Sequence, residues 1–521
     1  MPERQYVMAV DLGTGSCRAL VFDGDGNQVA MAQREWSHAA LPGVPGSQVF
    51  DTAGNWQLIC ACTREALAES GLSGSAIAAV SSTSMREGIV LYDADGRELW
   101  ACPNVDSRAA EEATELVRSG AARRIYDKGG DWVSITSPAR LLWIQRHEAE
   151  LFARVAHAGM LSDWVLTKLT GVYGTDPSVG ASSGMFDLAR ATWSPQIIEL
   201  CGLSPDVFPT VRDPGTVLGP LTARAAAETG LSEGTPVVVG GADTQLGLLG
   251  IGRTRPGEVT LVGGSFWQTT VVVDRPLIDP EARLRTLCHV LPGQWMAEGI
   301  AFYGGLTMRW FRDAFCDFEK AEAARRDVDP FVVMEEEAAA VAPGANGIVP
   351  VFSNVMDAKR WVQSSPAFIG FNIENPARSG RRECIRAVEE SAAYASLGHL
   401  RIIESLTGQP VEEIVFTGGG SKGRLWPQIV ADVLGVRVKV PVVRESTALG
   451  AALCAAVGAG LHDDLAGLAE RVARFEKTYE PDSTTHAAYA QLYERWREVY
   501  LRLLAITESG LVRPLWWPAG A

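Results

Sequence analysis

The sequence contains no long apolar run, no CxxC pair and no GxxxxGK[ST] phosphate loop. Its longest small and apolar stretch, residues 446–461, is shorter than the roughly 20 residues that a helix needs to span a bilayer. The missing phosphate loop excludes the P-loop class of nucleotide-binding enzymes. The N-terminal residues lead directly into a strand-like segment and do not resemble a signal peptide, so we expect a cytoplasmic protein without membrane contact.

Basic residues are fewer than acidic ones, 47 Lys and Arg against 62 Asp and Glu, which gives a formal net charge of -15. This balance disfavours nonspecific binding to nucleic acids or to anionic membranes. The nine cysteines are scattered, and the two that lie nearest to one another are Cys60 and Cys62. An odd, scattered set predicts reduced, buried thiols in a cytosolic protein.

The chain of 521 residues is too long for one hydrophobic core, so two or more domains are expected. Alternating strand and helix patterns predict an α/β fold. In the first half, the expected strands are 6–12, 18–22, 28–34, 77–82 and 235–240, and a helix is expected over 51–70. In the second half, strands are expected at 258–262, 267–273, 413–417 and 436–440, and helices at 382–406, 423–434 and 446–457.

The expected hairpin at 258–273 has the same form as the N-terminal one: an apolar run, a turn of Gly, Ser or Thr, and a second apolar run. This similarity indicates a weak internal duplication. We therefore predict two lobes, residues 1–249 and 250–521, each opening with a hairpin.

The first turn, residues 13–16, can present backbone N–H groups and the hydroxyls of Thr14 and Ser16 to an anion. Arg18 adds positive charge, and Asp11 is placed to hold Mg²⁺, which favours carboxylates and retained water. The alternative is an ordinary hairpin turn. The second turn is residues 263–265, with Gly264 and Ser265 as candidate binding residues, and two facing turns can hold one polyphosphate between them.

Asp243 ends an apolar strand inside the sequence GGADTQLG. A carboxylate in this position can accept the hydroxyl proton during phosphoryl transfer to an alcohol. The alternative role is that of a helix N-cap. Both interpretations remain open from this segment alone.

Residues 418–423, GGGSKG, follow a strand and formally match GxGxxG. A dinucleotide site would need an acidic residue at the end of the next strand, residues 436–441, and there is none. Gly418 and Gly419 fit equally well as the floor under an adenine ring.

Arg86 and Glu87 can donate to and accept from the oxygens of a substrate. Asn104, Asp106 and Arg108 form a second polar group before a helix. Taken singly, each of these residues is more typical of a surface or capping group.

Together these segments resemble the FGGY family of carbohydrate kinases, from about residue 6 to about residue 479. The most specific segments are AVDLGTGSCRALVFD, SSTSMREGIVLYD, GGADTQLG and TGGGSKGRLWPQIVADVLGVRVKVPVVRESTALGAAL. The resemblance implies two actin-like (ribonuclease H-like) ATPase lobes with an active-site cleft between them, and ATP and Mg²⁺ as cofactors. Many members carry Thr at the position of Ser265, and several carry Asn at the position of Gly423.

The same resemblance implies a role for each candidate residue. Asp11 would be the magnesium-associated carboxylate, and Asp243 the catalytic base. The other implied roles are substrate hydroxyl binding by Arg86 and Glu87, and ATP binding by Thr14, Ser16, Arg18, Gly264, Ser265, Gly418 and Gly419.

Within the family, residues 84–92 and 305–316 resemble a branch whose members phosphorylate open-chain dihydroxypentanedione on its primary hydroxyl. Met85 replaces the Gln of glycerol kinases, which argues against glycerol. A small polyol or dione is therefore the expected partner. The alternatives are a kinase of a ketopentose such as xylulose or ribulose, and an actin-like ATPase without a sugar substrate. The sequence does not indicate an oligomeric state.

Overall fold

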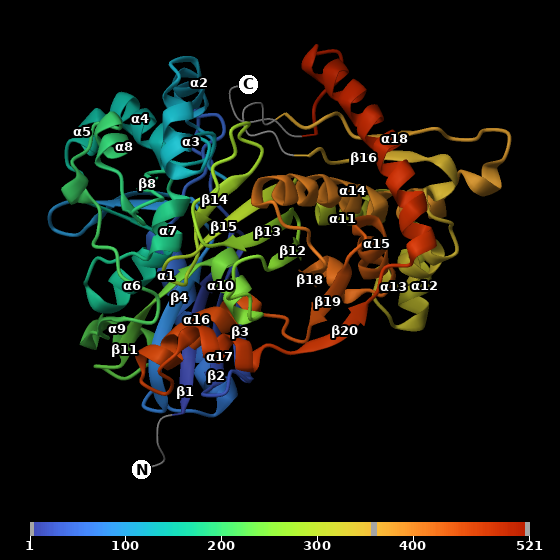
Figure 1. Cartoon of the computed structure of the whole chain (residues 1–521). Helices are drawn as coiled ribbons and strands as arrows, with labels where there is room; N and C mark the ends of the chain where they lie inside the picture. Colours follow the sequence, from blue (N-terminus) through green and yellow to red (C-terminus); the bar gives the residue numbers. More distant parts are fainter. Residues whose placement is uncertain (1–4, 356–361, 516–521) are drawn as a thin grey trace.

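The computed structural model describes residues 5–355 and 362–515, which form two sheet-containing lobes (Figure 1). The N-terminal sheet has the strand order β10-β11-β4-β1-β2-β3. Its strands are β1 (Tyr6–Leu12), β2 (Ser16–Asp23), β3 (Gln28–Glu35), β4 (Ile77–Ser84), β10 (Val217–Pro220) and β11 (Pro236–Ala242). The helices that contact it include α1 (Thr52–Ser70), α6 (Leu161–Thr170), α10 (Asp243–Gly250) and α16 (Ser446–Gly458).

The second sheet has the order β14-β15-β13-β12-β18-β19-β20. Its strands are β12 (Val259–Gly263), β13 (Trp267–Val273), β14 (Arg285–Cys288), β15 (Trp295–Ala301), β18 (Glu413–Thr417), β19 (Arg437–Pro441) and β20 (Phe475–Tyr479). The helices of this lobe include α11 (Gly304–Phe315), α12 (Asp317–Arg326), α13 (Pro330–Ala339), α14 (Arg381–Thr407), α15 (Leu425–Leu434) and α18 (Ser483–Glu508).

A smaller layer of helices and short strands extends from the N-terminal sheet, on the left of Figure 1. Its strands β5 (Ile89–Tyr92), β6 (Glu98–Cys102) and β7 (His157–Met160) form a three-stranded sheet. Its helices are α2 (Ala110–Arg118), α3 (Ala121–Gly129), α4 (Ser137–His147), α5 (Ala149–Phe152), α7 (Pro177–Ser182) and α8 (Pro195–Leu200).

The two large sheets share one pairing pattern. β1 is antiparallel to β2 and parallel to β4, and β12 is likewise antiparallel to β13 and parallel to β18. The expected internal duplication of the opening hairpins is therefore confirmed. The strands and helices predicted from apolar periodicity are also confirmed, with ends that shift by one or two residues.

The helix α16 belongs to the C-terminal part of the sequence but packs on the N-terminal sheet. It contacts β1, β4 and β11, and its alanines join a core with Val7 and Ala9. Gly450 allows α10 and α16 to approach closely, because it has no side chain. A Cβ atom at this position would lie 2.1 Å from the carbonyl oxygen of Leu246. The α10 helix is thereby fixed at the junction of the two lobes.

The nine cysteines are all buried and free, as the composition predicts. Among the helices in residues 5–355 and 362–515, none combines the length and apolar character needed to cross a membrane.

Candidate active site

Arg86, Glu87 and Asp243 lie together at one edge of the N-terminal sheet. The Arg86 Nε atom is 3.9 Å from the Asp243 carboxylate and 4.0 Å from the Glu87 carboxylate. Arg86 and Glu87 are buried, whereas the Asp243 side chain is 36% exposed. An accessible carboxylate therefore stands beside a buried pair of opposite charges.

Strand pairing explains this proximity. β4 and β11 are parallel neighbours, with Ser84 opposite Ala242, so the residues that follow both strands emerge at the same edge. Ligands of open α/β sheets bind outside the carboxyl ends of such strands. Asp243 is the first residue of α10, and its carboxylate accepts a hydrogen bond from the Thr244 N–H at 2.6 Å.

Electrostatics also act on Asp243. Desolvation by the surrounding protein raises the pKa of its carboxyl group, Arg86 lowers it and Glu87 raises it, and the net direction is upward. A carboxylate with a raised pKa is a stronger proton acceptor than free aspartate. This environment suits a general base.

The second sheet supplies two charged residues that we did not predict as site residues. Arg285 of β14 lies 2.7 Å from the Glu87 carboxylate and 3.4 Å from that of Glu298 on β15. Glu298 also pairs with Arg86 at 2.9 Å, and Arg285 contacts Asp131. The usable sequence signal was a charge within each short apolar strand, RTLC and WMAEGIA.

The sequence alone made Asn104, Asp106 and Arg108 more typical of surface or capping residues, and the structure differs for two of them. Asp106 and Arg108 are buried and form an ion pair at 2.7 Å. The Nη2 atom of Arg140, which is buried in α4, donates to the main-chain oxygens of Asn104 and Asp106. Asp106 and Arg108 are therefore structural supports of the loop after β6.

The first turn brings Asp11 and Arg18 together. The Arg18 guanidinium lies 3.9 Å from the Asp11 carboxylate and pairs with Glu445, which precedes α16. Burial raises the pKa of Asp11 to about 7; Arg18 opposes this rise, and Asp243 and Glu445 add to it. These carboxylates concentrate negative charge at the end of β1.

The turn itself is held by two aromatic residues that follow β3. The Trp36 indole N–H donates to the Thr14 carbonyl oxygen at 3.1 Å, and the His38 ring Nε2 lies 2.8 Å from the same oxygen. The Thr14 hydroxyl donates to Asn104 Oδ1 at 3.2 Å. Ser16 begins β2 beside this turn.

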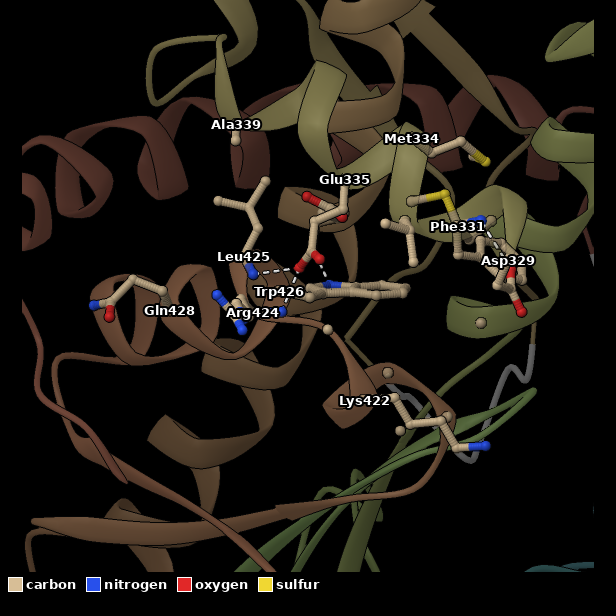
Figure 2. A pocket seen from close by; sticks show the side chains of 18 of the residues that line it. Asp329, Phe331, Met334, Glu335, Ala339, Lys422, Arg424, Leu425, Trp426 and Gln428 are labelled. Atoms are coloured by element: carbon tan, nitrogen blue, oxygen red, sulfur yellow. Dashed lines mark hydrogen bonds between the residues drawn. The ribbon is translucent and has the colours of Figure 1, made fainter. Parts of the chain in front are cut away.

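The second turn borders a cavity of about 1310 Å³ (Figure 2). The residues that line it all belong to the second half of the sequence, from Gly263 to Glu480. Gly264, Ser265 and Gly419 belong to its wall. Its apolar lining includes Phe331, Met334, Leu425 and Trp426.

Gly423 and Glu335 face each other in this cavity. Glu335 accepts hydrogen bonds from the main-chain N–H groups of Arg424, at 2.5 Å, and Leu425 (Figure 2). A Cβ atom at position 423 would lie 2.5 Å from the Glu335 carboxylate. Glu335 therefore occupies the space that a larger side chain at position 423 would require.

The family resemblance implies that Gly418 contributes to ATP binding, and on that expectation Gly418→Ala should weaken ATP binding. Gly418 has φ +88°, and an added Cβ would lie 2.9 Å from the Gly263 carbonyl oxygen, at the end of β12. Relief of this collision would displace the second turn, because a left-handed conformation is costly for Ala. The KM for ATP should rise about tenfold, which is about 1.4 kcal/mol of binding free energy.

The matched control is Gly408→Ala. Gly408 ends α14 with φ +71°, and nothing lies within 4 Å of its added Cβ. This control should lower the melting temperature without changing the KM for ATP. Equal KM values in the two variants would contradict the prediction.

The candidate residues thus form two sets. Asp11, Thr14, Ser16, Arg18, Arg86, Glu87 and Asp243 belong to the N-terminal lobe, and Gly264, Ser265, Gly418 and Gly419 belong to the second. Within the part of the chain that the structure describes, no direct hydrogen bond or ion pair joins the two sets. A ligand that engages both sets must bridge the lobes.

Two α/β lobes that share one strand-pairing pattern, one with a polar edge and the other with a glycine-lined cavity, have the architecture of the actin-like class. The sequence matches the models of the FGGY family of carbohydrate kinases, N-terminal domain at residues 6–250 and C-terminal domain at 267–459. The chain belongs to the FGGY family of carbohydrate kinases. It is therefore a phosphotransferase with an alcohol group as acceptor.

A curated relative is the autoinducer-2 kinase of Yersinia enterocolitica, 44% identical over 518 residues, which are 99% of this chain and 98% of the relative. The xylulose kinase structure from Rhodospirillum rubrum is 28% identical, with TM-score 0.85, and the match covers 97% of this chain and 100% of that one. The gluconate kinase structure from Lactobacillus acidophilus shares the fold at 21% identity, with TM-score 0.87. The match covers 97% of this chain and 99% of that one. The expected fold class is confirmed.

Proposed function

We propose that this protein is an ATP-dependent autoinducer-2 kinase. It would transfer the γ-phosphate to the primary hydroxyl of linear 4,5-dihydroxypentane-2,3-dione and give the 5-phosphate. The observation that carries the proposal is the accessible Asp243 carboxylate beside Arg86 and Glu87. The 44% identity to an autoinducer-2 kinase over 99% of this chain supports the substrate. The enzyme would act in the cytoplasm, and its reaction would be part of quorum sensing.

A ketopentose kinase is the second candidate, because a xylulose kinase structure covers 97% of this chain at 28% identity. Xylulose and the dione both offer a primary hydroxyl beside further oxygens. Membership of a carbohydrate kinase family sets aside the hypothesis of an ATPase without a sugar substrate.

The residues present fit Mg²⁺ and ATP. Mg²⁺ usually binds one or two carboxylates together with substrate phosphates and water. Burial raises the pKa of Asp11 to about 7, and Asp243 and Glu445 add to the rise, so a cation beside Asp11 would favour its charged form. Asp11 would hold the ion, which would offset phosphate charge during transfer.

The ATP-binding residues would divide between the lobes. Gly418 and Gly419 would lie under the adenosine. Phosphates would contact Thr14, Ser16 and Arg18 on one side and Gly264 and Ser265 on the other. Backbone N–H groups of such turns are suited to anions.

Catalysis would depend on the acceptor residues. Arg86 and Glu87 would orient the substrate oxygens, and Asp243 would accept the proton of the attacking hydroxyl. Closure of the lobes would exclude water and thereby limit ATP hydrolysis.

The test is mass spectrometry of the products formed from ATP and dihydroxypentanedione, with ADP release measured in parallel for xylulose, ribulose and glycerol. We expect a monophosphate of the dione and the highest kcat/KM for that acceptor. A higher kcat/KM for a ketopentose would replace the substrate assignment, and ADP release that no acceptor accelerates would contradict the kinase proposal.

A further inference from the structure

Arg140 holds two loops beside the candidate acceptor residues. It lies in α4 and is 1% exposed. Its Nη1 atom donates to the Glu87 carbonyl oxygen at 2.5 Å, and its Nη2 atom donates to the carbonyl oxygens of Asn104 at 2.9 Å and Asp106 at 2.8 Å. One guanidinium therefore fixes the main chain after β4 relative to the main chain after β6.

The Asn104 side chain extends this connection to the first turn. Its Oδ1 atom accepts the Thr14 hydroxyl at 3.2 Å, and the Thr14 carbonyl oxygen is bonded by Trp36 and His38. Arg140 and Asn104 thus join the acceptor site, which contains Arg86 and Glu87, to the first turn, residues 13–16, which we call the phosphate turn.

The conformation of Glu87 gives this connection an energetic consequence. Its φ is +64°, a region that non-glycine residues seldom adopt and that persists only where neighbours impose it. The Glu87 N–H donates to Ser182 Oγ at 3.4 Å, and its carbonyl oxygen is held by Arg140. Arg140 therefore helps to hold the left-handed main chain of Glu87, from which the carboxylate projects toward Arg285.

We propose that Asn104 and Arg140 are positioning residues that couple the acceptor site to the phosphate turn, so that either substrate increases the affinity for the other. The proposal rests on the kinase function above. An acceptor that binds at Glu87 favours the conformation in which Arg140 and Asn104 are bonded as described, and thermodynamic linkage makes the effect on the first turn reciprocal. Such coupling aligns the hydroxyl with the phosphate, where small displacements cost about 100-fold in rate.

Isothermal titration calorimetry tests this coupling. The affinity for the ATP analogue AMP-PNP with Mg²⁺ is measured with and without saturating dihydroxypentanedione. We expect the dione to tighten AMP-PNP binding by about tenfold in the wild type, within the usual range of site coupling. In Asn104→Ala, which removes only the acceptor of the Thr14 hydroxyl, we expect a factor near 1 with little change in the affinity for either ligand alone.

The matched control is Ser107→Ala, three residues along the same loop. Ser107 Oγ bonds the Gly46 carbonyl oxygen and does not contact the first turn within the described residues. This control should keep the wild-type coupling. In a double-mutant cycle, the losses of coupling between AMP-PNP and the dione in Thr14→Val and Asn104→Ala should not be additive, because both variants remove the same hydrogen bond. The proposed phosphate contact of Thr14 affects the affinity for AMP-PNP alone, which is measured separately.

Two results would overturn the proposal: no coupling in the wild type, or coupling that Asn104→Ala leaves intact. If the assay of substrates favours xylulose, xylulose replaces the dione in the calorimetry. Failure of the substrate assignment thereby stays separate from failure of the coupling. Melting temperatures of all variants identify any loss of coupling that merely reflects unfolding.

Discussion

Asp243→Asn should lower kcat by about 10²- to 10⁴-fold, the usual contribution of a positioned general base. The amide has the same shape as the carboxylate but does not accept the hydroxyl proton. Asp243 is proposed to act on the acceptor hydroxyl, so the KM for ATP should change by less than about threefold. Steady-state kinetics with ATP and dihydroxypentanedione provide the measurement.

The control for this variant is Asp213→Asn, an exposed aspartate before β10. It should match the wild type in both kcat and KM. A kcat for Asp243→Asn within about threefold of the wild-type value would remove Asp243 from the mechanism, whatever happens to its affinity for the acceptor.

Arg285→Met should damage both stability and acceptor use. The substitution leaves the carboxylates of Glu87, Asp131 and Glu298 buried without this guanidinium. Removal of one partner from a buried ion pair costs about 3–5 kcal/mol. Because Glu87 loses its nearest cation, kcat/KM for the acceptor should fall about 100-fold or more while the KM for ATP changes little.

Arg502→Met, in α18 of the same lobe, is the control. Arg502 pairs with Glu498 at 2.7 Å, and both side chains are exposed, so the loss of this pair should change stability by about 1 kcal/mol or less. Arg285→Met combined with Asp131→Asn should regain part of the melting temperature but not the activity. Recovery of full activity in that double variant would show that Arg285 acts through stability alone.

Much of this fold is predictable from apolar periodicity and turn residues. The strand ending at Leu12, the turn after it and the strand leading to Asp243 all have local signals, because a buried strand followed by glycine is readable within ten residues. Arg86 and Asp243 meet because β4 and β11 are parallel neighbours. The family resemblance implied the roles of these two residues but not the strand pairing that brings them together.

The supporting residues are not predictable in the same way. Arg285, Glu298 and Arg140 each come from an element that has no local link to residues 86–87. Their partners depend on strand register and helix placement, which a single sequence does not encode in its periodicity. A charged residue inside a short apolar strand was the available hint, because buried charges are expected to be paired.

The packing of α16 on the first sheet affects how the chain matures during synthesis. The apolar face formed by Val7, Ala9 and their neighbours is covered by residues 446–458, so the proposed lobe 1–249 lacks part of its core until that segment has left the ribosome. Contacts between the two ends of a chain slow folding, because loop closure precedes the gain from burial. We therefore expect the first half to complete its core only after residues 446–458 have been synthesised.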